Sequence, residues 1–187
     1  MIFQQRLRDL LVSRSVRLGD FTLASGARSD YYVDARRTTM SAEGQFLIGI
    51  VALEAIRDSG LRPTHVGGLT MGADPIAYAI AHRSYLDEVP IDAFSVRKQA
   101  KEHGTAQRIE GGLPSEGARC LMIEDSMTTG GSTLKAIDAV LEHGAEVVGV
   151  LTLVDRSENA AERFEARGLP LLSLYRGAEL LEAARAR

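Results

Sequence analysis

Residues 120–133 have the sequence CLMIEDSMTTGGST. The first four residues are apolar, as is typical of a strand that is buried on both faces of a sheet. Two carboxylates follow, then hydroxyl residues and a pair of glycines, and residues 132–143 have the spacing of an amphipathic helix. The segment therefore predicts a strand, a turn and a helix, the unit from which parallel sheets are built.

Each part of this segment suits one part of a phosphorylated sugar. Gly130 and Gly131 permit a tight turn, and the free N–H groups at the start of the helix form an anion site. Glu124 and Asp125 repel a phosphate, so they suit sugar hydroxyls or a Mg²⁺ ion held through water. The alternative is a solvated acid pair at a strand end, followed by an ordinary helix cap. The whole string favours a site for a phosphorylated ribose.

Strands and helices alternate along the rest of the chain. The sequence therefore predicts an α/β fold, in which a mostly parallel sheet is flanked by helices. Ligands bind such sheets outside the carboxyl ends of the strands. The apolar runs that predict buried strands are residues 65–69, 91–96, 119–124 and 146–154. The helical patterns between them are residues 74–84, 132–143 and 157–167.

The N-terminal part of the chain has a different pattern. Residues 2–14 place their leucines on one helical face, and two short extended runs follow at 21–23 and 31–33. A segment rich in turn residues separates these two runs. Ser41 is typical of a helix N-cap, and Gly60 fits the C-terminus of the helix that Ser41 begins.

The composition limits the function classes. The chain has 187 residues, so we expect residues 1–187 to form a single domain. Its 22 basic and 25 acidic residues give a net charge of −3, which argues against general affinity for nucleic acid or an anionic membrane. No apolar run is long enough to span a bilayer. The single cysteine, Cys120, lies in an apolar run, so we expect a buried thiol and a cytoplasmic protein.

Residues 98–117 form a long polar stretch between two predicted strands, and a loop of this length is usually a lid or a binding loop. Arg97, Lys98 and Lys101 make its start basic, and His103 adds a further hydrogen-bond donor. A basic loop is suited to neutralising a pyrophosphate leaving group as the site closes. The alternative is a solvated surface loop with incidental charges.

Three segments in the same order resemble one family. Residues 120–133 resemble the motif that binds 5-phospho-α-D-ribosyl 1-diphosphate (PRPP) in the type I phosphoribosyltransferases. Residues 96–111 resemble the mobile catalytic loop of the orotate phosphoribosyltransferases, and residues 23–34 resemble the hood segment of the same enzymes. With residues 153–156, the resemblance covers roughly 20–160. It implies the type I phosphoribosyltransferase fold, with a small hood at about residues 1–40 beside an α/β core.

The resemblance also implies an activity. These glycosyltransferases make orotidine 5′-monophosphate and diphosphate from orotate and PRPP, in pyrimidine (UMP) synthesis, with Mg²⁺ carried by the diphosphate substrate. Members of the family are homodimers, and the loop around Lys98 is expected to reach the site of the neighbouring subunit. The resemblance assigns catalysis to Lys101, His103 and Asp125. It assigns PRPP binding to Arg97, Lys98, Lys101, His103, Glu124, Asp125, Ser126, Met127, Thr128, Thr129, Gly130, Gly131 and Ser132.

Orotate binding is assigned by the same resemblance to Thr128 and Arg156. Arg156 follows a predicted strand on the same side of the sheet as the acid pair, and a guanidinium is the natural partner of a planar carboxylate. Without the resemblance, a surface ion pair would explain Arg156 equally well.

Two positions depart from the family pattern. Some members carry a lysine where this sequence has Ala24, and some carry one in the loop that is Thr70-Met71-Gly72-Ala73 here. Two other functions remain open at this point. A purine phosphoribosyltransferase would share the phosphate motif without the basic loop. A regulator that senses PRPP without turnover would usually show a basic nucleic-acid face.

Overall fold

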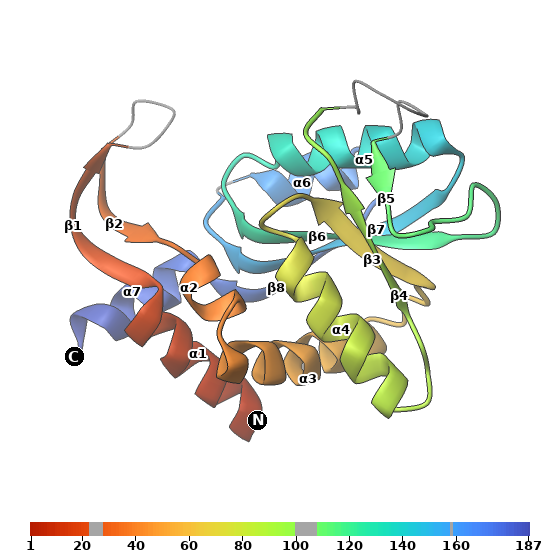
Figure 1. The fold of residues 1–187 in the computed structure, drawn as a ribbon. Coiled ribbons are helices and arrows are strands. Elements are labelled where there is room, and N and C mark those ends of the chain that lie inside the picture. Colours follow the sequence, from red (N-terminus) through yellow and green to blue (C-terminus); the bar gives the residue numbers. More distant parts are fainter. Residues whose placement is uncertain (23–27, 100–107, 158) are drawn as a thin grey trace.

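The computed structural model describes residues 1–22, 28–99, 108–157 and 159–187. A six-stranded sheet lies at the centre, with the strand order β5-β4-β3-β6-β7-β8 (Figure 1). All neighbouring strands are parallel except β5, which pairs antiparallel with β4, so the predicted mostly parallel sheet is confirmed. The strands are β3 (His65–Leu69), β4 (Asp92–Val96), β5 (Ile109–Glu110), β6 (Arg119–Met127), β7 (Glu146–Asp155) and β8 (Leu171–Arg176).

Helices cover both faces of the sheet (Figure 1). Leu121 and Ile123 of β6 join the core on one face, while Cys120 and Met122 join the core on the other. Successive side chains of a strand point to opposite faces, so β6 is buried on both sides as its apolar run predicts. The helices on the first face are α1 (Ile2–Arg14), α3 (Ala42–Asp58) and α4 (Asp74–Leu86), and those on the second are α5 (Gly131–His143) and α6 (Ala160–Glu165).

The N-terminal part, the hood of residues 1–40, stands beside the sheet. Its two strands, β1 (Val16–Thr22) and β2 (Arg28–Val33), form an antiparallel hairpin, and α2 (Arg36–Thr39) follows them. The C-terminal helix α7 (Gly177–Arg185) packs against α1 and β1. The Tyr175 hydroxyl donates to the Gln4 carbonyl at 2.7 Å, and Arg187 donates to the Asp9 carbonyl at 3.3 Å. Residues from both ends of the chain therefore build this side of the molecule.

Several local predictions are confirmed. The Ser41 hydroxyl accepts from the Gly44 N–H at 3.1 Å and caps α3, and Gly60 follows that helix with a left-handed φ of 72°. Helix α6 is shorter than the predicted 157–167, because the Asp155 carboxylate accepts the Ser157 N–H at 2.9 Å and holds a turn there. The structure also contains α2, β5, β8 and α7, which the sequence patterns do not predict.

Cys120 is fully buried, as predicted. Burial, aided by the charge of Glu146, raises the pKa of its thiol to about 12. The thiol is therefore protonated at neutral pH and is unsuited to act as a nucleophile. Separately, no helix in the described part of the chain has the length and apolar character needed to cross a bilayer.

Candidate functional site

The sheet reverses its direction of growth between β3 and β6. From β3 the chain passes through α4 to β4 on one side, whereas β6, β7 and β8 follow on the other side. Crevices form at such a switch point, outside the carboxyl ends of the strands, and ligands bind there. The loop of residues 70–73 follows β3, and residues 124–132 lie at the end of β6. The sheet therefore brings both predicted segments to its binding edge.

A turn formed by residues 128–132, here called the cradle, lies between β6 and α5. Gly130 has a left-handed φ of 72° and no side chain that could cap α5, and the Gly131 N–H donates to the Thr129 hydroxyl at a long 3.4 Å. The N–H groups at the start of this helix suit an anion. Thr128, Thr129 and Ser132 are exposed, so their hydroxyls are accessible as further donors. A small cavity of about 40 Å³ is lined by Glu124, Ser126, Met127, Thr128, Thr129, Gly130, Gly131 and Ser132.

Helix α6 supports the cradle from behind. A Cβ atom on Gly130 would lie 3.0 Å from the Phe164 ring, so the turn packs directly on this ring. The Arg163 guanidinium donates to the Thr129 carbonyl. Inside the cradle, the Ser126 hydroxyl is buried and has no hydrogen-bond partner among the described residues. A buried hydroxyl without a partner is costly, which favours a polar ligand at this place.

The two carboxylates lie within β6 and not after it. Neighbours in a strand ordinarily alternate between the two faces of a sheet, but the Glu124 and Asp125 side chains also interact with each other through a hydrogen bond and through their charges. Glu124 lies on the α5 side, where its carboxylate accepts from the Thr133 hydroxyl at 2.7 Å. The pKa of Glu124 is raised to about 7, chiefly by burial; the Thr133 hydrogen bond lowers it, and the charge of Asp125 raises it.

Asp125 lies against the loop that follows β3. A Cβ atom on Gly72 would lie 2.7 Å from the nearer Asp125 carboxylate oxygen, so this position has no room for a side chain while Asp125 keeps its place. The Asp74 carboxylate fixes the same loop by accepting from the Thr70 hydroxyl at 2.6 Å and from the Ser95 hydroxyl at 2.7 Å. The absence of a lysine at position 72 therefore fits the close approach of this loop to Asp125.

Arg156 lies where the sequence predicts it, beside the end of β6. Its N–H donates to the Met127 carbonyl at 2.8 Å. Its Nε is buried and has no hydrogen-bond partner among the described residues. The guanidinium carbon lies 4.8 Å from the centroid of the Tyr31 ring in the hood. An arginine held in this way has donors left for an anionic ligand.

The start of the basic loop follows β4. The Arg97 N–H donates to the Arg108 carbonyl at 2.7 Å, and the Arg97 guanidinium lies 3.4 Å from a Glu110 carboxylate oxygen. Lys98 is exposed and lines an open cavity beside α5, together with Lys135, and this cavity shares no lining residue with the cradle. Lys101, His103 and the hood residue Ala24 lie outside the described residues.

Comparisons with known proteins place this arrangement in a family. Residues 42–167 match the family described as "Phosphoribosyl transferase domain". The orotate phosphoribosyltransferase of Rhodopseudomonas palustris (strain TIE-1) is 49% identical over 179 residues, which cover 94% of this chain and 95% of that protein. The orotate phosphoribosyltransferase of Aquifex aeolicus (strain VF5) is 46% identical over 97% of this chain and 99% of its own length. This chain belongs to the orotate phosphoribosyltransferase family.

A solved structure supports the same conclusion. The crystal structure of Mycobacterium tuberculosis H37Rv orotate phosphoribosyltransferase in complex with PRPP has a TM-score of 0.78 and 42% sequence identity, and the match covers 95% of this chain and 98% of that one. The type I phosphoribosyltransferase fold, with its parallel sheet and its small N-terminal antiparallel sheet, is therefore confirmed.

Within this family member, sequence reasoning missed three residues around the site, and it placed the Thr133 hydroxyl among the donors to the phosphate and not at Glu124. Thr133 donates to Glu124, and Arg163 donates to the cradle. Tyr31 stacks on Arg156, and Gly177 lies against both of them. Thr133 belongs to the motif itself, so its hydroxyl was a usable signal. The other three come from segments distant in the sequence, and no local pattern marks them.

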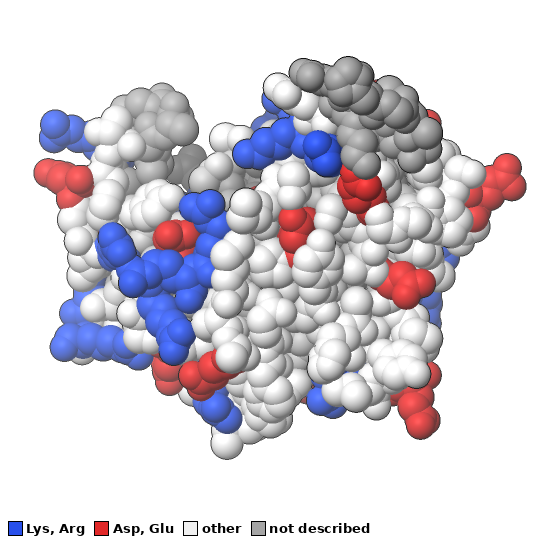
Figure 2. Space-filling model, viewed as in Figure 1, with Lys and Arg blue, Asp and Glu red and all other residues white. Residues whose placement is uncertain are grey.

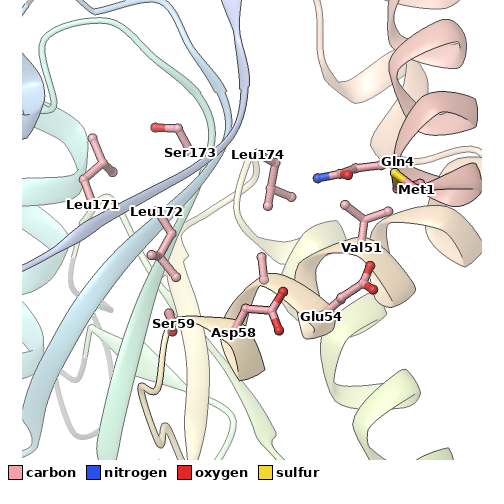
Figure 3. A pocket seen from close by; sticks show the side chains of 11 residues that line it. Met1, Gln4, Val51, Glu54, Asp58, Ser59, Leu171, Leu172, Ser173 and Leu174 are labelled. Atoms are coloured by element: carbon pink, nitrogen blue, oxygen red, sulfur yellow. The ribbon is translucent and has the colours of Figure 1, made fainter.

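A second cavity of the orotate phosphoribosyltransferase chain lies at the edge strand β8 (Figure 3). Its volume is about 630 Å³, and α1, α3 and β8 contribute its walls. Leu172 and Val51 give it an apolar surface, and Glu54 and Asp58 add carboxylates (Figure 3). None of the predicted site residues lines this cavity, so it is distinct from the cradle.

Proposed function

We propose that this chain transfers ribose 5-phosphate from PRPP to orotate, using the cradle, the acid pair and Arg156 in separate roles. A bond forms between orotate N1 and ribose C1, and the bond from C1 to the diphosphate oxygen breaks. The diphosphate leaves with the electron pair, and orotate loses its N1 proton. The transition state resembles the oxocarbenium ion of glycoside chemistry, with positive charge at C1. The observation that favours a base with a carboxylate is the buried Nε of Arg156, which has no hydrogen-bond partner among the described residues.

The cradle is proposed to hold the 5′-phosphate. The N-terminus of α5 supplies N–H groups and the positive end of a helix dipole. Thr128, Thr129 and Ser132 supply hydroxyls, and Ser126 has a buried hydroxyl that lacks a partner. These donors neutralise a dianion without a lysine or arginine inside the cradle.

The acid pair is proposed to fix the ribose hydroxyls. Asp125 lies beside the loop of residues 70–73, and Glu124 lies beside the cradle. Because the two carboxylates have different neighbours, each is placed to accept from a different group of the bound sugar. Hydroxyl donors at Glu124 would favour its charged form and lower its pKa again when PRPP binds.

Magnesium fits these residues as an ion that the diphosphate of PRPP carries into the site. Among the described residues, no group of three or more His, Cys, Asp or Glu side chains is placed to hold a metal ion. Asp125 nevertheless turns a carboxylate toward a loop that leaves no room for a side chain at Gly72, and carboxylates and phosphates are the ligands that Mg²⁺ prefers. When bound to the diphosphate, Mg²⁺ offsets its charge. Asp125 would orient that complex directly or through water.

The departing diphosphate is proposed to meet the basic loop. Arg97 and Lys98 stand at its start, and Lys101 and His103 continue it in the sequence. The negative charge on the leaving oxygen grows in the transition state, so cations that arrive with the loop stabilise that state more than the bound substrate. Lys101 and His103 are therefore assigned to catalysis together with Asp125.

A homodimer is proposed because α4 presents an apolar face that no element of the described chain covers. Tyr78, His82 and Tyr85 recur at helical spacing and are exposed, with Tyr85 at 76%. Met71 and Leu86 extend the exposed apolar surface at either end of the helix. Figure 2 shows few charged side chains over this face. Contiguous apolar surface of this kind marks protein interfaces, and a second copy would bring its own Lys98 loop to this side.

The hood and the core are proposed to form a single catalytic domain. The protein is proposed to be cytoplasmic. The single thiol is buried and protonated, so the described fold needs no oxidising compartment. The hood contributes Tyr31 at Arg156, so the base site spans hood and core.

The experiment that tests the proposed function is a panel of bases. PRPP and Mg²⁺ are presented with orotate, uracil, adenine or hypoxanthine, and the formation of diphosphate is measured. We expect turnover of orotate alone, because uracil lacks the carboxylate that Arg156 would pair with. A site built around such a contact rejects the analogue that lacks it by ~10⁴ or more. Arg156→Ala should lose most of this preference.

Arg167→Ala is the matched control, because Arg167 forms a surface ion pair with Asp138 at 2.7 Å. This variant should keep the wild-type preference. Preferential use of adenine or hypoxanthine would identify the protein as a purine phosphoribosyltransferase instead. Binding of PRPP without turnover of any base would instead favour a regulator.

A further inference from the structure

We propose that Tyr31 and Gly177 are positioning residues that set the direction of the Arg156 guanidinium, and through it the preference for a carboxylated base. The inference rests on the proposed role of Arg156 in binding orotate. It concerns two residues that lie far apart in the sequence and meet only at this side chain.

Tyr31 packs against Arg156, whose guanidinium carbon lies over the face of the tyrosine ring. The ring centroid lies 4.8 Å from the guanidinium carbon. Stacking of this kind attracts the cation and leaves the N–H groups free, because these point outward in the plane of the guanidinium. The buried Nε has no hydrogen-bond partner within the described residues. Tyr31 therefore fixes the plane of Arg156 while the donors at its edge stay available.

Gly177 gives both side chains the room to meet. A Cβ atom at this position would lie 2.8 Å from Arg156 Cγ and 2.9 Å from the Tyr31 hydroxyl oxygen. The φ of Gly177 is outside the left-handed region, so the backbone itself does not require glycine here. The requirement is one of space. Any side chain at position 177 must displace Arg156, Tyr31 or both.

The main chain of Arg156 is already fixed by other contacts. Its N–H donates to the Met127 carbonyl at 2.8 Å. On its other side, the buried Asp155 carboxylate accepts the Ser157 N–H at 2.9 Å and pairs with Arg176 at 2.7 Å. The Cα position of Arg156 therefore follows from β6 and β7, and the remaining freedom is that of its side chain. Tyr31 and Gly177 restrict that freedom.

The two positioning residues do not touch the phosphate cradle. Gly177 lies at the junction of β8 and α7, and Tyr31 lies on β2 of the hood, whereas the cradle lies between β6 and α5. Changes at Tyr31 or Gly177 should therefore alter the use of orotate and leave the binding of PRPP largely unchanged. A residue needed only for stability would affect both substrates alike.

The test measures KM for orotate and for PRPP in Gly177→Ala, Tyr31→Leu and Tyr31→Phe. In Gly177→Ala and Tyr31→Leu, we expect KM for orotate to rise about tenfold, the size of a stacking contact in a partly buried site. KM for PRPP should change by less than about twofold, because neither residue touches the cradle. A general loss of folded structure would instead raise KM for both substrates. Tyr31→Phe keeps the ring and should resemble the wild type.

A double variant separates crowding from general damage. Phenylalanine at position 31 removes the hydroxyl that an alanine side chain at 177 would meet. Gly177→Ala/Tyr31→Phe should therefore recover part of the orotate KM lost in Gly177→Ala, which is coupling that independent sites do not show. Tyr32→Leu is the matched control. Tyr32 lies next to Tyr31 on β2 but stacks on Phe21 at 5.7 Å, so this variant should leave KM for orotate near the wild-type value.

Arg156→Ala, measured in the same series, separates the positioning role of Tyr31 and Gly177 from the proposed role of Arg156 in binding orotate. If it raises KM for orotate while Gly177→Ala and Tyr31→Leu do not, the positioning role is overturned and the proposed role of Arg156 stands. If Arg156→Ala itself leaves KM for orotate unchanged, both are overturned. Thermal unfolding of each variant confirms that the measured protein is folded.

Discussion

Glu124 and Asp125 are adjacent in the chain, but their surroundings differ. Glu124 faces α5 and shares a hydrogen bond with Thr133, and its burial raises its pKa to about 7. Asp125 faces the loop after β3, and its carboxylate occupies the space that a side chain at Gly72 would need. Two neighbouring acids in opposite environments can therefore carry two different tasks at one sugar.

The first residue-scale prediction concerns Asp125. Asp125→Asn should lower kcat by at least about tenfold, which corresponds to about 1.4 kcal/mol of transition-state stabilisation. The substitution is isosteric, so circular dichroism and the melting temperature should stay close to those of the wild type. Asp58→Asn on α3, far from the cradle, is the matched control and should keep full activity. Wild-type turnover in folded Asp125→Asn would remove Asp125 from the mechanism.

The second residue-scale prediction concerns the pH dependence of stability. The pKa of Glu124 is about 7 in the folded protein, above its ordinary value of 4.5, so the folded state binds this proton more tightly than the unfolded state. Its contribution to stability is full below about pH 4.5 and is lost as the pH rises toward 7. Glu124→Gln should remove this loss, making the variant relatively more stable at pH 8 than at pH 5 by about 1–3 kcal/mol.

Urea unfolding at both pH values measures this difference. Glu142→Gln, an exposed glutamate on α5, is the control and should show the same offset from the wild type at pH 5 and pH 8. Parallel stability curves for the wild type and Glu124→Gln would contradict the raised pKa.

At the scale of elements, the loop of residues 70–73 and the end of β6 act as a pair. Asp74 fixes the loop through Thr70 and Ser95, and Gly72 lets the loop approach Asp125. A lysine in this loop, which the resemblance leads one to expect, would supply a cation to the diphosphate. Here the loop has only backbone groups to offer, so the position of Asp125 relative to this backbone becomes important.

Gly72→Ala tests this pairing. The added methyl group must displace the Asp125 carboxylate, so we expect KM for PRPP to rise and kcat/KM to fall by about tenfold or more. Combined with Asp125→Asn, the same change should cost much less, because both variants disturb one contact. Steady-state kinetics of the two single variants and the double variant decide this. Fully additive losses would show that Gly72 acts independently of Asp125.

The same elements show what the sequence could predict. β6 was predictable because its apolar run is buried on both faces, and the cradle was predictable because all its residues are contiguous. β8 was missed because it is a partly exposed edge strand, although residues 171–175 contain an apolar run that was a usable signal. The contacts of Tyr31 and Gly177 with Arg156 could not be predicted, because three distant segments meet there.

At the scale of the whole molecule, the exposed face of α4 and the position of Lys98 are both explained by the proposed dimer. Lys98 lines a cavity beside α5 that shares no residue with the cradle of its own chain. In the proposed dimer, the basic loop of one subunit meets the diphosphate bound at the site of the other. Two subunits would then complete each site, and neither would be fully active alone.

Mixed dimers test this arrangement. Lys101→Ala damages the loop and Asp125→Asn damages the acid pair, so each variant alone should be nearly inactive. When equal amounts are unfolded together and refolded, half of the dimers are mixed and each has one intact site, so about a quarter of the wild-type rate should return. Adding Tyr85→Glu to both chains places charge on the α4 face and should abolish the recovery. No recovery in dimers shown to be mixed would place the loop on its own subunit.

The contacts between the two ends of the chain affect how the protein is made. Gln4 and Asp9 in α1 bond to Tyr175 and Arg187, so α1 can pack on α3 early in synthesis but completes these contacts only after β8 and α7 have been made. A nascent chain that stops before β8 already holds every residue of the cradle. It lacks Gly177, and it lacks the α7 surface against which β1 packs. Translation therefore supplies the cradle, Arg156 and Tyr31 first, and it adds Gly177, which restricts the Arg156 side chain, only after β8.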